Sequence, residues 1–281
     1  MTIGRRGFLK RGAVWLGACS ASVGLYTWQV EPHWLEVVER ELPIAHLPGS
    51  LAGRRLVQLS DLHVGLQVDD DYVLHVFDVV RDLAADIVVY TGDFTSYHAD
   101  VARHAKRIYA RAPRGRLATL GIFGNHDYGP GWRHPELAAE LLPPLEAAGI
   151  RVLRNEVVDV AGLDVVGLDD WWARQFRPMD VLAYRDAAKP GIVLSHNPDT
   201  VDLAGWANYE GWILSGHTHG GQCKAPFLPP PLLPVRNRRY TRGEFDVGGN
   251  RRLYISRGVG HTLQVRFNVR PEVTVFTLTM G

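Results

Sequence analysis

Short, largely apolar runs rich in β-branched residues recur along this chain and alternate with segments of helical periodicity. Five of these runs predict buried strands: 56–59, 87–90, 118–123, 192–194 and 212–214. Two more, 163–166 and 273–276, predict further strands, and the alternating pattern of 273–276 places it near a sheet edge or in a second sheet. Strands that alternate with helices imply a mainly parallel sheet covered by helices, so an α/β protein is expected.

Three helices are expected between the strands. Asp70 can cap the first, whose apolar face comprises Val73, Val76, Phe77, Val80 and Leu83. The second is predicted over 100–110. The third begins at Pro135 and is predicted to bend or end near Pro143 and Pro144, because proline removes a helical hydrogen bond. The chain has no internal repeat, and its body fits a single domain.

The distribution of charge excludes one class of function. The chain has 31 Lys and Arg against 30 Asp and Glu, and its first four basic residues all precede the first acidic residue, Glu31. Without those four, the chain has 27 basic and 30 acidic residues. A non-specific nucleic-acid binder needs a basic body, so no nucleic-acid partner is expected. The two cysteines, Cys19 and Cys223, are too few for a disulfide framework.

The N-terminus has the pattern of a targeting segment. A basic run at 4–10, Gly-Arg-Arg-Gly-Phe-Leu-Lys, is followed by 12–30, which has no charged side chain. Paired arginines before Phe-Leu-Lys resemble a twin-arginine export signal, which implies the twin-arginine translocation machinery as a partner. We therefore assign 1–30 as a signal or membrane anchor and 31–281 as the folded domain.

The fate of this segment has three alternatives. A helix over 12–30 would just cross a hydrocarbon layer of about 30 Å, so the segment could be kept as an anchor. It could also be cleaved, or lipidated at Cys19. Because the basic run precedes the apolar segment, the body is expected on the periplasmic, outer face of the cytoplasmic membrane.

Polar clusters follow the five predicted buried strands. They are Ser60-Asp61-Leu62-His63, Thr91-Gly92-Asp93, Gly124-Asn125-His126-Asp127, Ser195-His196-Asn197-Pro198-Asp199 and Gly216-His217-Thr218-His219-Gly220-Gly221. In open α/β sheets ligands bind beyond the carboxyl ends of the strands, so the clusters should converge on one rim. Oxygen and nitrogen ligands without thiolate suit Mn²⁺, Fe or Zn²⁺, and their surplus over one tetrahedral site indicates two divalent ions.

Each cluster alone is ambiguous, but their ordered combination is specific. An isolated histidine more often makes structural hydrogen bonds than binds a metal, and Gly-Asp often marks a turn. Together, however, the blocks over 56–221 resemble the calcineurin-like metallophosphoesterase superfamily in content and order: Asp61-x-His63, Gly92-Asp93, Gly124-Asn125-His126-Asp127, His196 and Gly216-His217-Thr218-His219. The resemblance implies, for 31–281, an αββα sandwich of two packed mixed β-sheets flanked by helices.

The same resemblance implies the site and its chemistry. One metal would be held by Asp61, His63 and His219, the other by Asn125, His196 and His217, with Asp93 bridging them. His126 would face the substrate and either protonate the leaving oxygen or stabilise charge, and Asp127 would orient His126 by accepting its second N–H. The implied reaction is hydrolysis of a phosphate ester through in-line attack by a metal-bridging hydroxide.

Further segments resemble one branch of the superfamily, namely exported or membrane-anchored bacterial phosphoesterases similar to UDP-2,3-diacylglucosamine pyrophosphatases of lipid A synthesis. These are the twin-arginine start, 60–65, 195–199, 220–222 and 256–260. The expected substrate is a phosphodiester or another phosphorylated small molecule, lipid or envelope polymer, met at the membrane surface by a monomer. Two alternatives stay open: a UDP-2,3-diacylglucosamine pyrophosphatase-like hydrolase, and a non-catalytic metal-binding envelope protein.

Substrate choice is expected to depend on residues around the rim. The candidates are Tyr97, His98, Tyr128, Trp132, 169–172 and the apolar residues of the proline-rich stretch 225–234, which is predicted to be an extended surface loop. Trp171 and Trp172 could instead pack beneath loops. Cys223 could be a packed residue or a soft metal ligand, and packing is favoured.

Overall fold

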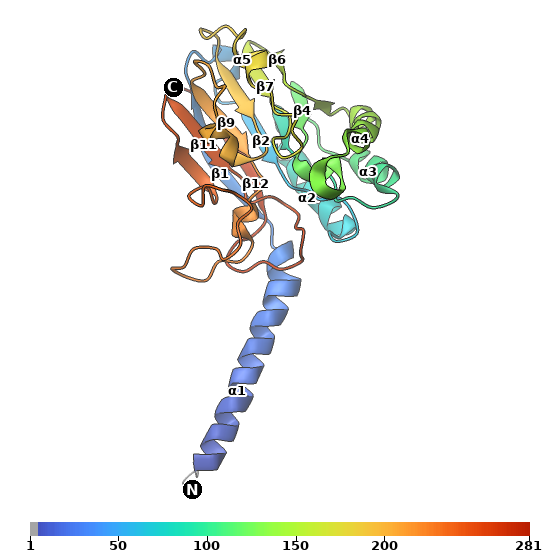
Figure 1. The fold of residues 1–281 in the computed structure, drawn as a ribbon, viewed down its shortest axis with the longest axis vertical. Coiled ribbons are helices and arrows are strands. Elements are labelled where there is room, and N and C mark those ends of the chain that lie inside the picture. Colours follow the sequence, from blue (N-terminus) through green and yellow to red (C-terminus); the bar gives the residue numbers. More distant parts are fainter. Residues whose placement is uncertain (1–4) are drawn as a thin grey trace.

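The computed structural model describes residues 5–281, in which two six-stranded sheets form the body (Figure 1). The first sheet has the order β1 (Glu36–Ile44), β12 (Glu272–Met280), β2 (Arg55–Leu59), β3 (Ile87–Thr91), β4 (Ala118–Ile122) and β5 (Arg151–Val152). The second has the order β10 (Gly243–Asp246), β11 (Arg251–Ile255), β9 (Gly211–Ser215), β8 (Gly191–Leu194), β7 (Leu163–Gly167) and β6 (Glu156–Val160). Each sheet mixes parallel and antiparallel pairs, so the predicted pair of mixed sheets is confirmed.

Successive apolar side chains of the central strands point alternately to the two faces of the first sheet, so there is a hydrophobic core on each face. Ile87 and Val89 belong to the apolar cluster that also contains Ile192 and Leu194 of the second sheet. The intervening Val88 belongs to the cluster with the helices. Because successive side chains on a strand point to opposite faces, a strand buried on both sides reads as a continuous apolar run.

Helices cover the outer face of the first sheet. They are α2 (Asp70–Asp82), α3 (Val101–Tyr109) and α4 (Pro135–Ala147), on the right in Figure 1. The outer face of the second sheet packs mainly against loops and the short helix α5 (Met179–Leu182). Helical cover is therefore unequal on the two sides of the sandwich.

One detail of the predicted helices was wrong. The cap of α2 is Asp69 rather than Asp70, because the Asp69 carboxylate accepts a hydrogen bond from the backbone N–H of Asp71 at 2.7 Å. Of the two alternatives for α4, a bend or an end near Pro143 and Pro144, the end is excluded, because the helix continues through both prolines to Ala147. Its apolar residues, such as Leu141 and Leu145, are fully buried in the core, and this burial favours the helical path.

The prediction that strand 273–276 lies near a sheet edge is confirmed. Strand β12 is the second strand of the first sheet, between the edge strand β1 and β2, and six of its nine residues are buried. The alternating pattern arises because Thr274 is buried, with its hydroxyl donating to the Glu272 carboxylate at 2.6 Å. Strands β1, β5, β6, β10 and β11 were not predicted. In β6 and β10, half-buried residues alternate with exposed residues along most of the strand, so neither strand has an apolar run.

The N-terminal segment forms α1 (Arg5–Leu25), which projects from the body, and a π-helical turn over Tyr26–Val30 (Figure 1). The turn is tied to the body by its carbonyls: Thr27 accepts from the Arg266 N–H at 2.9 Å and Trp28 from the Gln264 amide at 3.1 Å. Within residues 5–281, no helix combines the length and the apolar character needed to span a membrane. The assignment of 1–30 as a signal or anchor stays a prediction.

Candidate metal centre

Loops that follow β2, β3, β4, β8 and β9 meet at one end of the sandwich. The first three strands are parallel neighbours in one sheet and the last two are parallel neighbours in the other. Gln58, the one polar residue in the run 56–59, joins the sheets there: its buried amide donates to Thr91 Oγ1 and to the Ser215 carbonyl, both at 2.9 Å. The predicted rim therefore forms between two sheets rather than along one.

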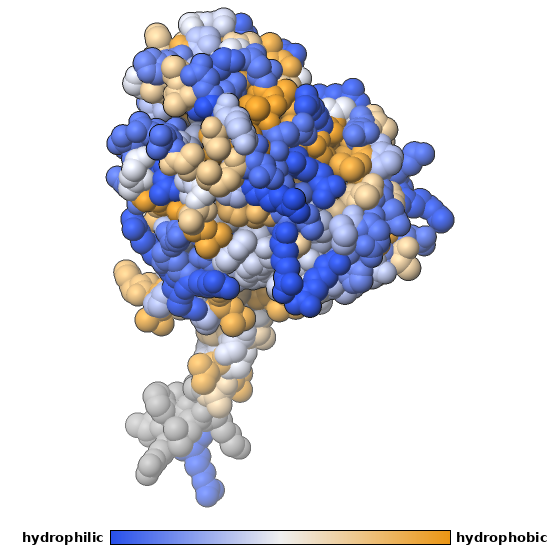
Figure 2. Space-filling model, turned by 45° about the horizontal axis from the view of Figure 1, so that its top comes forward, coloured by the Kyte–Doolittle hydropathy of each residue, from blue (hydrophilic) through white to orange (hydrophobic). Residues whose placement is uncertain are grey.

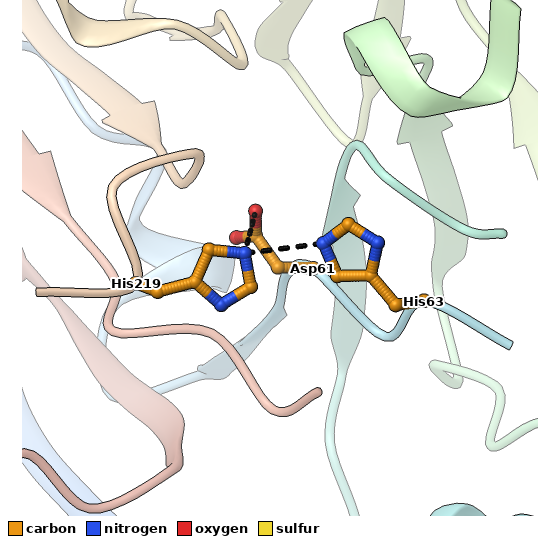
Figure 3. A group of neighbouring side chains, drawn as sticks. All are labelled: Asp61, His63 and His219. Atoms are coloured by element: carbon orange, nitrogen blue, oxygen red, sulfur yellow. Dashed lines mark hydrogen bonds and ion pairs between the residues drawn. The ribbon is translucent and has the colours of Figure 1, made fainter. Parts of the chain in front are cut away.

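One cluster at this end comprises Asp61, His63 and His219 (Figure 3). Asp61 and His63 follow β2, whereas His219 follows β9, and all three side chains are buried. His219 Nε2 lies 3.1 Å from His63 Nε2 and 3.5 Å from Asp61 Oδ1. Three donor atoms from both sheets thus face a common point, as the ligands of one divalent ion do.

A second cluster comprises Asp93, His196 and His217. His196 Nε2 lies 3.2 Å from Asp93 Oδ2 and 3.2 Å from His217 Nδ1. The same Asp93 oxygen is 3.5 Å from His63 Nε2 of the first cluster. Asp93 therefore lies between the two clusters, where a bridging ligand belongs.

Asn125 lies in the short 3₁₀ turn Asn125–Tyr128 that follows β4. It is buried, and neither its amide oxygen nor its amide nitrogen has a hydrogen-bond partner among the described residues. A buried amide without partners costs stability unless something else satisfies it. A metal ion at the second cluster would satisfy the oxygen, which agrees with the ligand role predicted for Asn125.

Hydrogen bonds to the far nitrogens set which ring nitrogen each histidine presents. His196 donates from Nδ1 to the Thr91 carbonyl at 2.7 Å, and His217 donates from Nε2 to the Pro234 carbonyl at 2.7 Å. A carbonyl oxygen only accepts, so each bond places a proton on the far nitrogen, and the opposite ring nitrogen faces the cluster and can bind a metal when the ring is neutral. For His196, burial opposes ionisation, but the charge of Asp93 raises the pKa to about 10, so this ring would release its second proton when it binds a metal. The sequence gives no signal for these partners, because Pro234 belongs to a distant proline-rich loop.

The ligand loops are sharply bent. Five of the seven predicted ligands have left-handed backbone, a conformation that residues other than glycine rarely adopt: Asp61, His63, Asp93, His217 and His219. Close approach is needed as well, since a Cβ on Gly124 would lie 2.3 Å from Asp93 Oδ1 and one on Gly216 would lie 2.3 Å from Asp61 Oδ2. This lack of space for a side chain explains why the motifs contain glycine beside the ligands.

Burial keeps three imidazoles in the form that binds metal. It lowers the pKa of His63 to about 3. Burial and the charge of His196 lower the pKa of His217 to about 3, and burial holds the pKa of His219 well below its usual value. All three rings are neutral at pH 7, which is the protonation state of a ligating histidine.

The carboxylates respond differently to burial. For Asp61, burial outweighs the opposing charge of His196 and raises the pKa to about 6. For Asp93, burial acts against ionisation, but His196 and the neighbouring imidazoles hold the pKa well below its usual value. Asp93 is therefore negatively charged at neutral pH, between the clusters where cations would bind.

His126 and Asp127 have different surroundings from those predicted. The His126 ring is half-buried and packs edge-on against the His63 ring at 4.9 Å, so it lies at the mouth of the site. Asp127 is buried and accepts from the backbone N–H groups of Gly124 at 2.9 Å and Thr95 at 3.0 Å, not from the His126 ring. The prediction that Asp127 orients His126 by accepting its second N–H is therefore wrong, because its oxygens hold the loops after β3 and β4 together.

The sequence also gave no indication of a role for Arg266. Its guanidinium is fully buried and donates to the carbonyls of Arg257, Gly258, Gly260 and Val269. One of its nitrogens lies 3.5 Å from His219 Nδ1. The side chain thus braces the loop after β11 against the first cluster. Its partners are backbone carbonyls, which carry no sequence pattern that would distinguish this arginine from a surface residue.

Two tryptophans form the wall beside the second cluster. Trp172 packs edge-on against the His217 ring at 4.4 Å, and Trp132 packs on Trp172 at 4.5 Å. Trp171 instead packs against the Arg236 guanidinium at 4.8 Å. Tyr128, predicted at the rim, is fully buried in the core between the sheet and the helices. Only part of the predicted rim therefore borders the site.

Comparison with known proteins gives consistent matches along nearly the whole chain. The family model for calcineurin-like phosphoesterases matches residues 54–221. The chain is 32% identical to Phosphodiesterase YaeI of Escherichia coli strain K12, over 98% of this chain and 99% of that protein. It is 32% identical to the metallophosphoesterase YkuE of Bacillus subtilis, over 98% and 97% of the two chains. It is 26% identical to UDP-2,3-diacylglucosamine pyrophosphatase LpxG of Chlamydia muridarum, over 91% and 93%.

Proposed function

Since this chain belongs to the calcineurin-like phosphoesterase family and is a metal-dependent phosphoester hydrolase, we propose that it hydrolyses phosphodiesters at a two-metal centre between its two sheets. One observation carries the proposal. Asp93 Oδ2 lies within 3.5 Å of a histidine nitrogen from each of two separate three-residue clusters. A carboxylate shared in this way suits a pair of ions rather than one.

The residues present fit two divalent ions. Asp61, His63 and His219 would hold one, Asn125, His196 and His217 the other, and Asp93 both. The donors are oxygen and imidazole nitrogen, which suit Mn²⁺, Fe or Zn²⁺. When bound, the ions supply positive charge that holds the phosphate and lowers the pKa of the water that attacks phosphorus.

His126 is proposed as the catalytic residue of the chain itself. Its backbone N–H donates to Asp93 Oδ1 at 2.8 Å, so the residue is held beside the bridging position while its ring stays partly open to solvent. A ring at the mouth can donate a proton to a departing alkoxide, which buried ligands cannot do. A non-catalytic metal-binding protein would not need such a ring, and this disfavours that alternative.

A pyrophosphatase activity is the second candidate. Similarity to LpxG over about nine-tenths of both chains favours it. Cleavage of a nucleoside-diphosphate lipid by the metal-loaded protein, with no turnover of simple diesters, would select it over phosphodiester hydrolysis.

Metal removal tests the proposed function. Hydrolysis of bis-p-nitrophenyl phosphate is expected to fall at least about a hundredfold after chelation and dialysis, and to return on addition of Mn²⁺, Fe²⁺ or Zn²⁺. Elemental analysis of the active protein should find about two ions per chain, since the site has two sets of ligands. Undiminished hydrolysis by protein shown to be free of metal would contradict the proposal.

We also propose that 1–30 directs export by the twin-arginine pathway and that the body acts on the periplasmic face of the cytoplasmic membrane. The paired Arg5 and Arg6 before Phe8-Leu9-Lys10 support this. Protease added to intact spheroplasts is expected to degrade the body. Protection until the cells are lysed would place the body in the cytoplasm and reject the proposal.

A further inference from the structure

An apolar groove of about 450 Å³ opens directly beside the first cluster. Its inner end is formed by His219 and Thr218, and its sides by apolar residues of two loops that follow in the chain: Leu232, Leu233, Leu263 and Val265. This volume is within the usual range of about 300–1,000 Å³ for small-molecule sites. A group attached to a phosphate at the metal centre could therefore extend into the groove.

Hydrogen bonds fix one wall of the groove to the segment after β9. The Gln222 side-chain amide donates to the carbonyls of Leu263 and Val265, both at 2.9 Å. Next to it, backbone bonds join Phe267 to Gln222 and Lys224 to Phe267, each at 2.9 Å. These bonds fix the wall that carries Leu263 and Val265 without an occupant, so little ordering of that wall is needed when a ligand enters.

The lining determines what kind of group can enter. Among the described residues that line the groove there is no Asp, Glu, Lys or Arg, and His219 belongs to the metal cluster. A charged occupant would lose its hydration here without gaining a partner of opposite charge. A hydrocarbon chain has no polar hydration to lose, and its transfer from water into the groove lowers the free energy.

The open end of the groove is apolar as well. Leu232 is 80% exposed and Leu263 is 67% exposed. The loops that carry them lie at the end of the body from which α1 projects (Figure 1). Figure 2 shows apolar side chains, in orange, where the body meets that helix. Apolar surface is thus continuous from the groove to the outside, as a path for a long chain requires.

We propose that the groove holds the hydrocarbon chain of an amphiphilic phosphate ester while the phosphate lies at the metal centre. This inference rests on the proposed function and names its substrate class. His219 belongs both to the first cluster and to the lining of the groove, so a group in the groove lies next to the position of the reacting phosphate. Leu232, Leu233, Leu263 and Val265 are then specificity-determining residues.

Two esters that differ only in chain length test the proposal. Methyl p-nitrophenyl phosphate and octyl p-nitrophenyl phosphate have the same leaving group and the same charge, and both are used at concentrations at which the octyl ester is monomeric. In the metal-loaded protein, kcat/KM is expected to be at least about tenfold higher for the octyl ester, since each buried methylene favours binding several-fold.

Variants of the groove test whether the hydrocarbon chain of the octyl ester binds there. Leu232→Asp and Leu263→Asp are expected to lower the octyl-to-methyl ratio at least about fivefold, and the ratio cancels any effect of the new charge on the phosphate. Because both side chains are largely exposed, the variants should melt at the wild-type temperature. The control is Leu117→Asp, the same change at a residue that is 47% exposed, directly precedes β4 and lies outside the groove, and it should keep the wild-type ratio and turnover.

The outcomes separate this inference from the proposed function. If the wild-type protein turns over both esters with equal kcat/KM, the groove proposal is overturned and the phosphodiesterase proposal stands. If Leu232→Asp and Leu263→Asp both keep the wild-type octyl-to-methyl ratio of kcat/KM, the hydrocarbon chain of the substrate binds elsewhere and the groove proposal again fails. If neither ester is hydrolysed by the metal-loaded protein, both proposals fail.

Discussion

Replacing Asp93 with asparagine is expected to lower bis-p-nitrophenyl phosphate hydrolysis at least about a thousandfold. The substitution removes the negative charge that lies 3.2 Å from His196 and 3.5 Å from His63 while leaving the side-chain shape unchanged. Loss of about 4 kcal/mol of transition-state stabilisation gives a factor of this size. Metal content should fall below two ions per chain, because both clusters lose their shared oxygen.

A matched control shows whether this loss comes from the site. Asp78→Asn makes the same chemical change on the exposed side of α2, where Asp78 forms ion pairs with Arg81 and Arg111. It should keep wild-type turnover and metal content. In Asp93→Asn the amide oxygen can still accept from the His126 N–H, so the fold is expected to persist, as circular dichroism can check. Turnover equal to the wild type in Asp93→Asn would reject the enzyme mechanism.

The His126→Ala variant is expected to keep both metal ions but to lose activity in proportion to the difficulty of the leaving group. The ring lies outside both clusters and is half-buried at the mouth, so its removal leaves the predicted ligands in place. A general acid contributes about 10²–10⁴ in rate, and its contribution grows as the leaving oxygen becomes more basic. We expect kcat for methyl phenyl phosphate to fall by that factor.

The comparison substrate is methyl p-nitrophenyl phosphate, whose leaving group departs without protonation. The fall in kcat for this ester should be clearly smaller. An equal fall for the two esters would mean that His126 stabilises charge on the phosphoryl group instead of donating a proton. The exposed His75 of α2 supplies the control His75→Ala, which should match the wild type on both substrates.

Much of the site could be predicted because ligands and strand ends coincide in the sequence. Apolar runs that become β2, β3, β4, β8 and β9 end one or two residues before the polar motifs. Parallel strands place their carboxyl ends together, so linear order was enough to bring Asp61 and Asp93 to one end of the first sheet, and His196 and His217 to one end of the second. Six of the seven ligands implied by the family resemblance form two groups of close neighbours in the structure, namely Asp61, His63 and His219, and Asp93, His196 and His217. Their role as ligands stays a prediction.

Residues that act through long-range contacts could not be predicted in this way. Asp127 follows His126 directly, and sequence adjacency suggested a pair, yet its carboxylate bonds to Gly124 and Thr95 instead. Arg266 and the Pro234 carbonyl touch the site from loops that carry no motif. Strand β12 enters the first sheet from the far end of the chain, and its own alternating sequence does not specify that it pairs with β1 and β2.

Local chemistry and chain order by themselves determined the fold class, the strand ends and the donor atoms, because hydrophobic periodicity and motif spacing are properties of neighbouring residues. Only the tertiary structure decided that the rim forms between two sheets, which nitrogen each histidine presents, and that an apolar groove begins at His219. Those features depend on residues more than a hundred positions apart or on loops without periodicity. Their arrangement is selected by the packing of the whole chain rather than by any local preference.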